Sequence, residues 1–252
     1  MKKLARILAA VLLLGAAAVV LCTALGVRLT PRRQRYVAEP LSSQPYLARA
    51  TSADSDTRAA AVAELARRKD PAAVPVLAAV LKDDKQPGLR AAAACALGSI
   101  GRKEALPALA DALKDRSELV YRSAFWAVGQ LRDPAAVELL CLHLHQTDDR
   151  VRAEEAAWAL RHFPSELAEP PLIQRLEKTP ISHVSLNVAA SLACVGTEKS
   201  LPALRRLRLL LPRDLERGTD DLPSPDRLHY DLAVVVQRAI ADIEARTGAR
   251  KP

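Results

Sequence analysis

The histidines and cysteines are the residues from which this sequence could build a metal or catalytic site. His143 and His145 form a His-x-His, but side chains two residues apart on a helix point about 200° apart around its axis and do not close on one ion. His162 and Cys194 share one register of neighbouring helices, which run about 8–10 Å apart, far for a shared zinc. We therefore expect the histidines to pack laterally or to lie at the surface.

Other motifs that carry chemistry are missing from the sequence. It has no Ser-His-Asp pattern, no glycine-rich phosphate loop and no spaced Cys-x-x-Cys. Cys22, Cys95, Cys141 and Cys194 lack metal or redox spacing, so we interpret them as small apolar residues. We assign no catalytic residue, no metal ligand and no cofactor, and we expect a protein without catalysis of its own.

The composition indicates which elements would have to position any functional side chain. Half of the 252 residues are hydrophobic but only 3% are aromatic, and Ala, Leu and Val supply the apolar content. Such residues suit closely packed helices better than a β-sandwich, which needs β-branched and aromatic faces. The sequence predicts an all-α fold.

A period of 31 or 32 residues runs through the chain. Each predicted first helix of a unit ends in an apolar anchor residue, and a small or β-branched residue lies four positions earlier, one turn away on the same face. This spacing indicates closely packed helices. The five anchors are Leu65, Leu97, Val128, Leu160 and Leu192.

A second amphipathic helix follows each first helix. Leucine stands twelve residues after every anchor, and in four of the five units another leucine follows four residues later, where the fifth unit has Arg208. Turn formers such as Asp70-Pro71 and Asp133-Pro134 separate the helices, because Asp can cap a helix and Pro fits its first turn. The pattern predicts five helix-turn-helix units.

The stretch from Leu89 to Gly101 (LRAAAACALGSIG), followed by Ala105 to Leu109 (ALPAL), resembles the HEAT family, specifically the short HEAT-like repeats first associated with phycobilisome lyases. The resemblance covers residues 56–212. It implies an α-solenoid of about five HEAT-like repeats, whereas such repeats occur in scaffolds, lyases and hydroxylases alike.

The resemblance also allows two family features to be sought in this chain. The deoxyhypusine hydroxylases of the family bind two irons through His-Glu pairs, but this sequence has no such pair, and Glu154-Glu155 come without imidazoles. The family's arginine near the start of the first helix is in phase at Arg58 and Arg90 only, since Arg122 and Arg152 are one residue out of phase. We expect neither a di-iron site nor a regular arginine ladder.

Two tryptophans occupy one row of the repeat register. Trp126 and Trp158 both lie two residues before an anchor, a position that points away from the core face of the helix. Tryptophan is enriched at interaction hot spots, so the pair predicts an apolar ridge that binds a partner protein. Burial by repeat curvature, cover by residues 30–55 and contact with lipid remain the alternatives.

The formal charge of +8 does not indicate nucleic-acid binding. Seven basic residues and no acidic one lie among the first 35 residues, which leaves 30 basic and 29 acidic groups in residues 36–252. A nearly neutral body lacks the basic stripe that phosphate contacts need. A local cluster, Arg205, Arg206, Arg208, Arg213 and Arg217, stands close to several acids and is interpreted as a solvated face.

The N-terminal segment predicts a membrane anchor. Residues 7–27 carry no charge and as a helix would extend about 31 Å, the thickness of the hydrocarbon core. We place a transmembrane helix at residues 7–29 and the repeats on the extracytoplasmic (periplasmic) side, because a short basic tail usually stays cytoplasmic. A cleaved signal peptide, a lipoprotein lipidated at Cys22, and repeats on the cytoplasmic side are the alternatives.

These elements give the expected organisation and function. A basic tail (1–6), the anchor (7–29), a linker with a possible capping half-repeat from Pro45 to Ala50 (30–55) and the repeat domain (56–248) follow in order, with an extra loop at 212–226 and a C-terminal capping helix. We expect a membrane-tethered scaffold that binds a protein partner. A lyase-like or oxidoreductase-associated repeat protein that acts on a protein partner is the alternative.

Overall fold

The computed structural model describes residues 42–146, 149–179, 181–212 and 224–249. Helices and short connections make up these residues, and no strand occurs within the described ranges. The transmembrane helix predicted at residues 7–29 lies outside the described residues. In the part of the chain that the structure describes, no helix combines the length and the apolar character needed to cross a bilayer.

Twelve α-helices carry the fold in these ranges. Short 3-10 turns precede three of the second helices: Pro71–Ala73, Lys103–Ala105 and Glu198–Ser200. The α-helices are α2 (Gln44–Arg49), α3 (Ser55–Arg68), α4 (Val74–Asp83), α5 (Pro87–Ile100), α6 (Leu106–Ala112), α7 (Glu118–Leu131), α8 (Ala135–His145), α9 (Arg150–Leu160), α10 (Ser165–Lys178), α11 (His183–Val195), α12 (Leu201–Leu209) and α13 (Ser224–Thr247).

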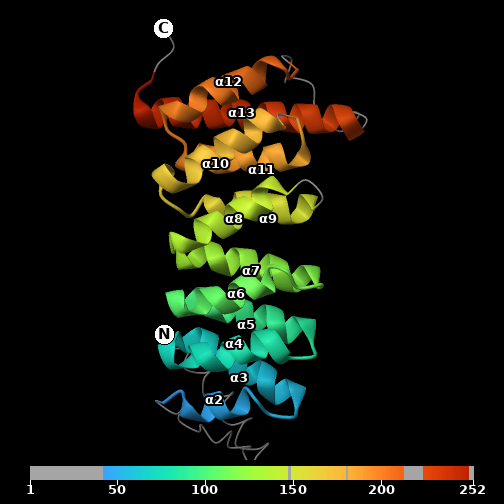
Figure 1. The fold of residues 1–252 in the computed structure, drawn as a ribbon, viewed down its shortest axis with the longest axis vertical. Coiled ribbons are helices and arrows are strands. Elements are labelled where there is room, and N and C mark those ends of the chain that lie inside the picture. Colours follow the sequence, from blue (N-terminus) through green and yellow to red (C-terminus); the bar gives the residue numbers. More distant parts are fainter. Residues whose placement is uncertain (1–41, 147–148, 180, 213–223, 250–252) are drawn as a thin grey trace, which may run out of the picture. The chain divides into compact units, whose positions relative to one another are not determined.

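The helices form two layers that follow the chain order (Figure 1). Helices α3, α5, α7, α9, α11 and α13 pack one against the next in the first layer. In the second layer α4 packs on α6, α8 on α10 and α10 on α12, and each of these five helices also packs on the first-layer helix that follows it. This arrangement confirms the predicted all-α solenoid.

The core lies between the two layers and matches the repeat register. All five anchors have no exposed surface, and neither do the five leucines twelve residues further on: Leu77, Leu109, Leu140, Leu172 and Leu204. At about 25 cal/mol for each Å² of apolar surface removed from water, each of these leucines contributes on the order of 2 kcal/mol. The register read from the sequence is therefore the packing register.

Two glycines let the first-layer helices approach closely. A Cβ added to Gly98 on α5 would lie 2.7 Å from Ala127 Cα on α7, and one added to Gly129 would lie 3.0 Å from His162 Cδ2, just after α9. Both glycines directly follow an anchor. Glycine at this position removes the side chain that would otherwise hold the neighbouring helix away.

The turns follow the predicted capping chemistry. The Asp70 carboxylate accepts a hydrogen bond from the Ala72 amide, and Pro71 opens the short helix after it. The Asp133 carboxylate accepts in the same way from the Ala135 amide. Each carboxylate satisfies an amide that the helix itself leaves unpaired.

The arginine ladder ends after two steps, as the register predicted. Arg58 Nε donates to Asp84 (2.7 Å) and Arg90 Nε donates to Asp115 (2.9 Å), so each arginine joins the first helix of a unit to the end of its second helix. Arg122 bonds Glu155 of the next unit instead. Bonding to Arg90 lowers the pKa of the Asp115 carboxyl.

A helix lies at each end of the solenoid, where a cap was predicted. Helix α2 covers α3 where the half-repeat was expected. Helix α13 covers α11 and buries Leu232, Val236, Ala239 and Ile243. It begins at Ser224, so the last three residues of the loop predicted at 212–226 are helical, while residues 213–223 lie outside the described ranges.

Candidate partner-binding groove

Trp126 on α7 and Trp158 on α9 lie in the same row of the first layer, as the register predicted. They do not face solvent fully, however, because both side chains are half-buried. Trp126 packs against the core, and its Cζ3 atom would lie 3.0 Å from a Cβ on Gly98 of α5. The close approach of α5 and α7 therefore draws this ring toward α5, which the periodicity of a single helix does not reveal.

Trp158 is held by two neighbours that lie just beyond the C-terminal end of its helix, α9. The His162 ring meets it edge-on with 4.9 Å between centroids, and the Arg161 guanidinium lies 5.8 Å from the indole centroid. Burial lowers the pKa of His162, and the positive charges of Arg161 and Arg132 lower it further. The indole therefore contacts the His162 ring and lies close to the Arg161 cation.

A groove of about 400 Å³ lies between the two tryptophans. It crosses three successive first-layer helices, α7, α9 and α11. The sequence pattern predicted only the two tryptophans as part of a binding surface. The other residues that line the groove also follow the repeat register, since each lies five or six positions before an anchor, one helical turn before the tryptophan row. The groove is lined by Arg122, Trp126, Glu154, Glu155, Trp158 and Asn187.

Ion pairs order the charged side of this groove. Arg122 Nε donates to Glu155 (2.7 Å) and its Nη1 donates to Glu118 (3.1 Å), while Arg150 lies 3.4 Å from Glu154. The hydrogen bond to Glu155 raises the pKa of Arg122. The carboxylates are therefore partly neutralised, and a ligand meets two indole walls beside oriented polar groups and the Asn187 amide.

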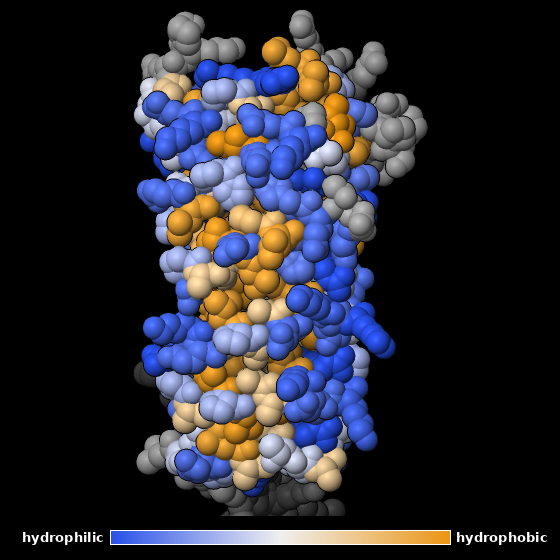
Figure 2. All heavy atoms as spheres, in the orientation of Figure 1, coloured by the Kyte–Doolittle hydropathy of each residue, from blue (hydrophilic) through white to orange (hydrophobic). Residues whose placement is uncertain are grey.

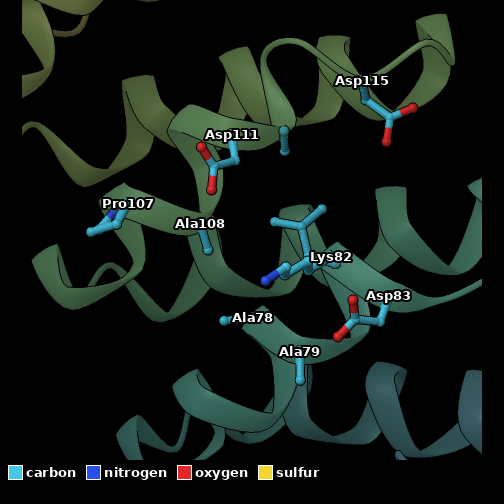
Figure 3. Close-up of a pocket in the computed structure, with 10 residues that line it drawn as sticks. Ala78, Ala79, Lys82, Asp83, Pro107, Ala108, Asp111 and Asp115 are labelled. Carbon is cyan, nitrogen blue, oxygen red and sulfur yellow. The ribbon is translucent and has the colours of Figure 1, made fainter.

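A second hollow of about 460 Å³ lies on the other layer, between α4 and α6 (Figure 3). Small residues, Ala78, Ala79 and Ala108, form much of its wall, and the Lys82 side chain extends from α4 into it. Asp115 at its edge is already bonded to Arg90. This hollow has no aromatic wall and no buried polar group left for a ligand, so it is the weaker candidate.

The histidine and cysteine candidates do not converge. His143 is buried, contrary to a surface position, and its ring packs edge-on against Phe125 with 5.3 Å between centroids. Cys194 is exposed and its Sγ accepts a bond from Arg161 (3.3 Å) rather than meeting His162. Within the described ranges, no three His, Cys, Asp or Glu side chains gather to hold a metal ion.

The chain is similar to several solved structures, at 15–20% sequence identity in the three that follow. The complex of CpcE and CpcF of phycocyanin lyase from Nostoc sp. PCC7120 is 20% identical, with 84% of this chain and 100% of that chain covered and a TM-score of 0.50. A designed armadillo repeat protein in complex with the peptide (KR)4 is 19% identical (79% and 98% covered, TM-score 0.48). Human deoxyhypusine hydroxylase in complex with glycerol is 15% identical (78% and 95% covered, TM-score 0.36).

The likeness to the phycocyanin lyase complex concerns the fold alone, since sites are grafted onto a fold independently of it. No curated protein matches the chain. The family model for HEAT repeats matches residues 43–124 and 83–161, which together run from α2 to the end of α9. The same register of anchors continues through α11. Residues 43–161 are therefore HEAT repeats.

Proposed function

We propose that this protein is a membrane-tethered scaffold, without catalysis of its own, that binds a segment of a partner protein in the groove between Trp126 and Trp158. The observation that carries the proposal is the groove itself, which crosses three successive helices and has two half-buried indoles in its wall. Aromatic side chains in a sheltered groove supply much apolar contact area while losing little conformational entropy.

The tether rests on the sequence. The uncharged run of residues 7–27 is long enough for a bilayer, and the basic tail before it favours repeats on the extracytoplasmic side. Removing residues 1–29 should then move the protein from the membrane fraction to the supernatant. Recovery of the full-length chain in the supernatant after alkaline extraction would contradict the tether.

The side of the membrane can be read from one cysteine. Cys194 is exposed, whereas Cys95 and Cys141 are half-buried. A maleimide that does not cross membranes should label Cys194 in cells whose outer envelope is opened but whose inner membrane is intact. The Cys194→Ser variant controls for the other thiols, and labelling only after lysis would place the repeats in the cytoplasm.

The groove is tested after partners have been identified by proximity labelling from a tag at Pro252. Trp126→Ser together with Trp158→Ser should weaken the leading partner by at least about 30-fold, the loss of roughly 2 kcal/mol that defines a hot spot. Leu142→Ser is the matched control, because Leu142 is 60% exposed on the other layer.

A second variant separates binding from folding, since Trp126 also packs against the core. Asn187→Arg fills the groove without removing an apolar contact, so thermal stability should stay close to that of the wild type while the partner is lost. Unchanged affinity in both the serine and the arginine variants would rule out the groove as the binding site.

A further inference from the structure

The last helix pair leaves a position of the solenoid open. Ile240 lies 48 residues after Leu192, one and a half repeat periods, and α13 repeats the burial pattern of α11 around it. Its buried residues Leu232, Val236 and Ile243 correspond to Val184, Val188 and Val195. Ile240 is thus the sixth anchor, and the extra half period is the segment between α12 and α13.

This sixth anchor is not covered as the others are. The five earlier anchors have no exposed surface, but Ile240 is half-buried. Three residues before the anchor, α3, α5, α7, α9 and α11 each bury an apolar side chain, whereas α13 exposes Gln237. On α12, Arg208 stands where the earlier second helices bury Leu81, Leu113, Leu144 and Leu176.

These positions meet in a groove of about 520 Å³ between α12 and α13. Its lining is mostly apolar, from Leu209, Ile240, Ala241 and the stems of longer side chains. Leu209 is 77% exposed and the adjoining Leu210 is 56% exposed, the former the largest such fraction among the exposed large apolar residues of the described ranges. Figure 2 shows apolar atoms gathered at this end, over α12 and α13.

The second layer shows what would fill such a groove. Helix α8 is followed in its layer by α10, and α10 by α12, so a further helix packed on α12 would continue the series. Solenoids usually end in a repeat with a polar outer face, because an apolar end has no neighbour to cover it. Here the end face stays apolar.

The charges of the groove favour a helix that carries acidic side chains. Arg208 Nη1 donates to the carbonyls of Leu211 (3.3 Å) and Pro212 (2.7 Å), and no carboxylate pairs with it among the described residues. Arg205 pairs with Glu244 (2.7 Å), but its buried Nε has no hydrogen-bond partner in the described ranges. The groove therefore carries excess positive charge beside an apolar floor.

We infer that the groove between α12 and α13 docks an amphipathic helix of a partner protein, with an acidic side chain that pairs with Arg208, as one further second-layer helix after α12. The groove between α12 and α13 shares no helix with the groove between Trp126 and Trp158, so this inference does not depend on the proposed function of that other groove. Helix-in-groove recognition of this kind reads apolar anchors at helical spacing and charges beside them.

The probe is a helix that already fills a second-layer position in this chain. A stapled peptide of residues 103–115 contains α6, which packs on α4. The peptide bears Leu106, Leu109 and Leu113 together with the acidic Glu104 and Asp111. Fluorescence anisotropy with the full chain measures its binding. A peptide with lysine at the positions of Glu104 and Asp111 should bind about tenfold more weakly.

Variants of the groove complete the test. Arg208→Glu and Leu209→Ser should each weaken the acidic peptide about tenfold, whereas Arg238→Glu, at an 81%-exposed side chain on α13 outside the groove, should not. Leu209 is too exposed for its loss to unfold the chain. Equal binding by all variants, or no binding of the acidic peptide, would overturn the inference.

Sedimentation of the full chain tests whether a second copy of the chain fills the groove instead. The experiment uses detergent to solubilise the apolar residues 1–29. A concentration-dependent dimer that Leu209→Ser abolishes would make a second copy of the chain the occupant and overturn the partner helix. A chain that stays monomeric while the peptide binds supports it. Because the Trp126 and Trp158 variants keep this groove, loss of one binding activity without the other distinguishes the two sites.

Discussion

Arg152 places its guanidinium over the ring of Tyr121, 4.2 Å from the ring centroid. Tyr121 stands seven residues before its anchor, the position that Arg58 and Arg90 hold in the first two units. Arg90 Nη1 donates to the carbonyl of Asp84, six residues before it. The matching carbonyl of Asp115 instead accepts from Arg152 Nη2 (2.9 Å), so an arginine from the next unit replaces the missing one.

Removing Arg152 should therefore destabilise the middle of the solenoid. Arg152→Ala leaves the carbonyls of Leu113 and Asp115 without this donor and uncovers the Tyr121 ring, so we expect a loss of about 1–2 kcal/mol in the free energy of unfolding. Urea titration measures it. Arg150→Ala, at a side chain 58% exposed on the same helix, should change stability by less than about 0.5 kcal/mol.

Two glycines of α5 should respond in opposite directions to alanine. Gly98→Ala puts a Cβ 2.7 Å from Ala127 Cα and 2.8 Å from Ala127 Cβ, so the helices must separate, at a cost of about 1–3 kcal/mol that exceeds the gain in helix propensity. Gly88 has no atom within 4 Å of such a Cβ, and Gly88→Ala should stabilise by up to about 1 kcal/mol. Equal thermal shifts for the two variants would contradict the close approach.

Protonation of His143 should destabilise the protein in mild acid. Burial lowers the pKa of this imidazole, Arg152 and Lys114 add to the effect, and Gln146 and Asp149 oppose it. Because the folded pKa lies below the unfolded value of about 6.5, the unfolded chain takes up the proton first, and stability falls as pH drops through about 6.5.

His143→Leu should make the free energy of unfolding less dependent on pH. Leucine fits this repeat position, because Leu207 occupies it in the fifth unit. Denaturant titrations at pH 7.5 and pH 5.5 compare the variant with the wild type. His145 and His162 keep part of the slope, since burial lowers the pKa of each. His183→Gln, at an exposed position, is the control substitution.

The fold could be predicted from the sequence because its information is local. The anchors Leu65 to Leu192 recur with one period, and which face of a helix they occupy follows from 3.6 residues per turn alone. The turns at Asp70 and Asp133, the cap at α2 and the final helix were equally readable, since capping depends on neighbouring residues. Shared registry also placed Trp126 and Trp158 in one row.

Only the tertiary structure decided which neighbours the residues at each repeat position contact. The half-burial of Trp126 depends on how closely α7 approaches Gly98, and the stacking of Arg152 on Tyr121 depends on the offset between two units. Arg208 was visible as a departure from the pattern, but the uncovered anchor beside it, Ile240, was not, because the inserted segment hides its register. Separations and offsets between helices arise from side chains distant in sequence, which helical periodicity does not encode.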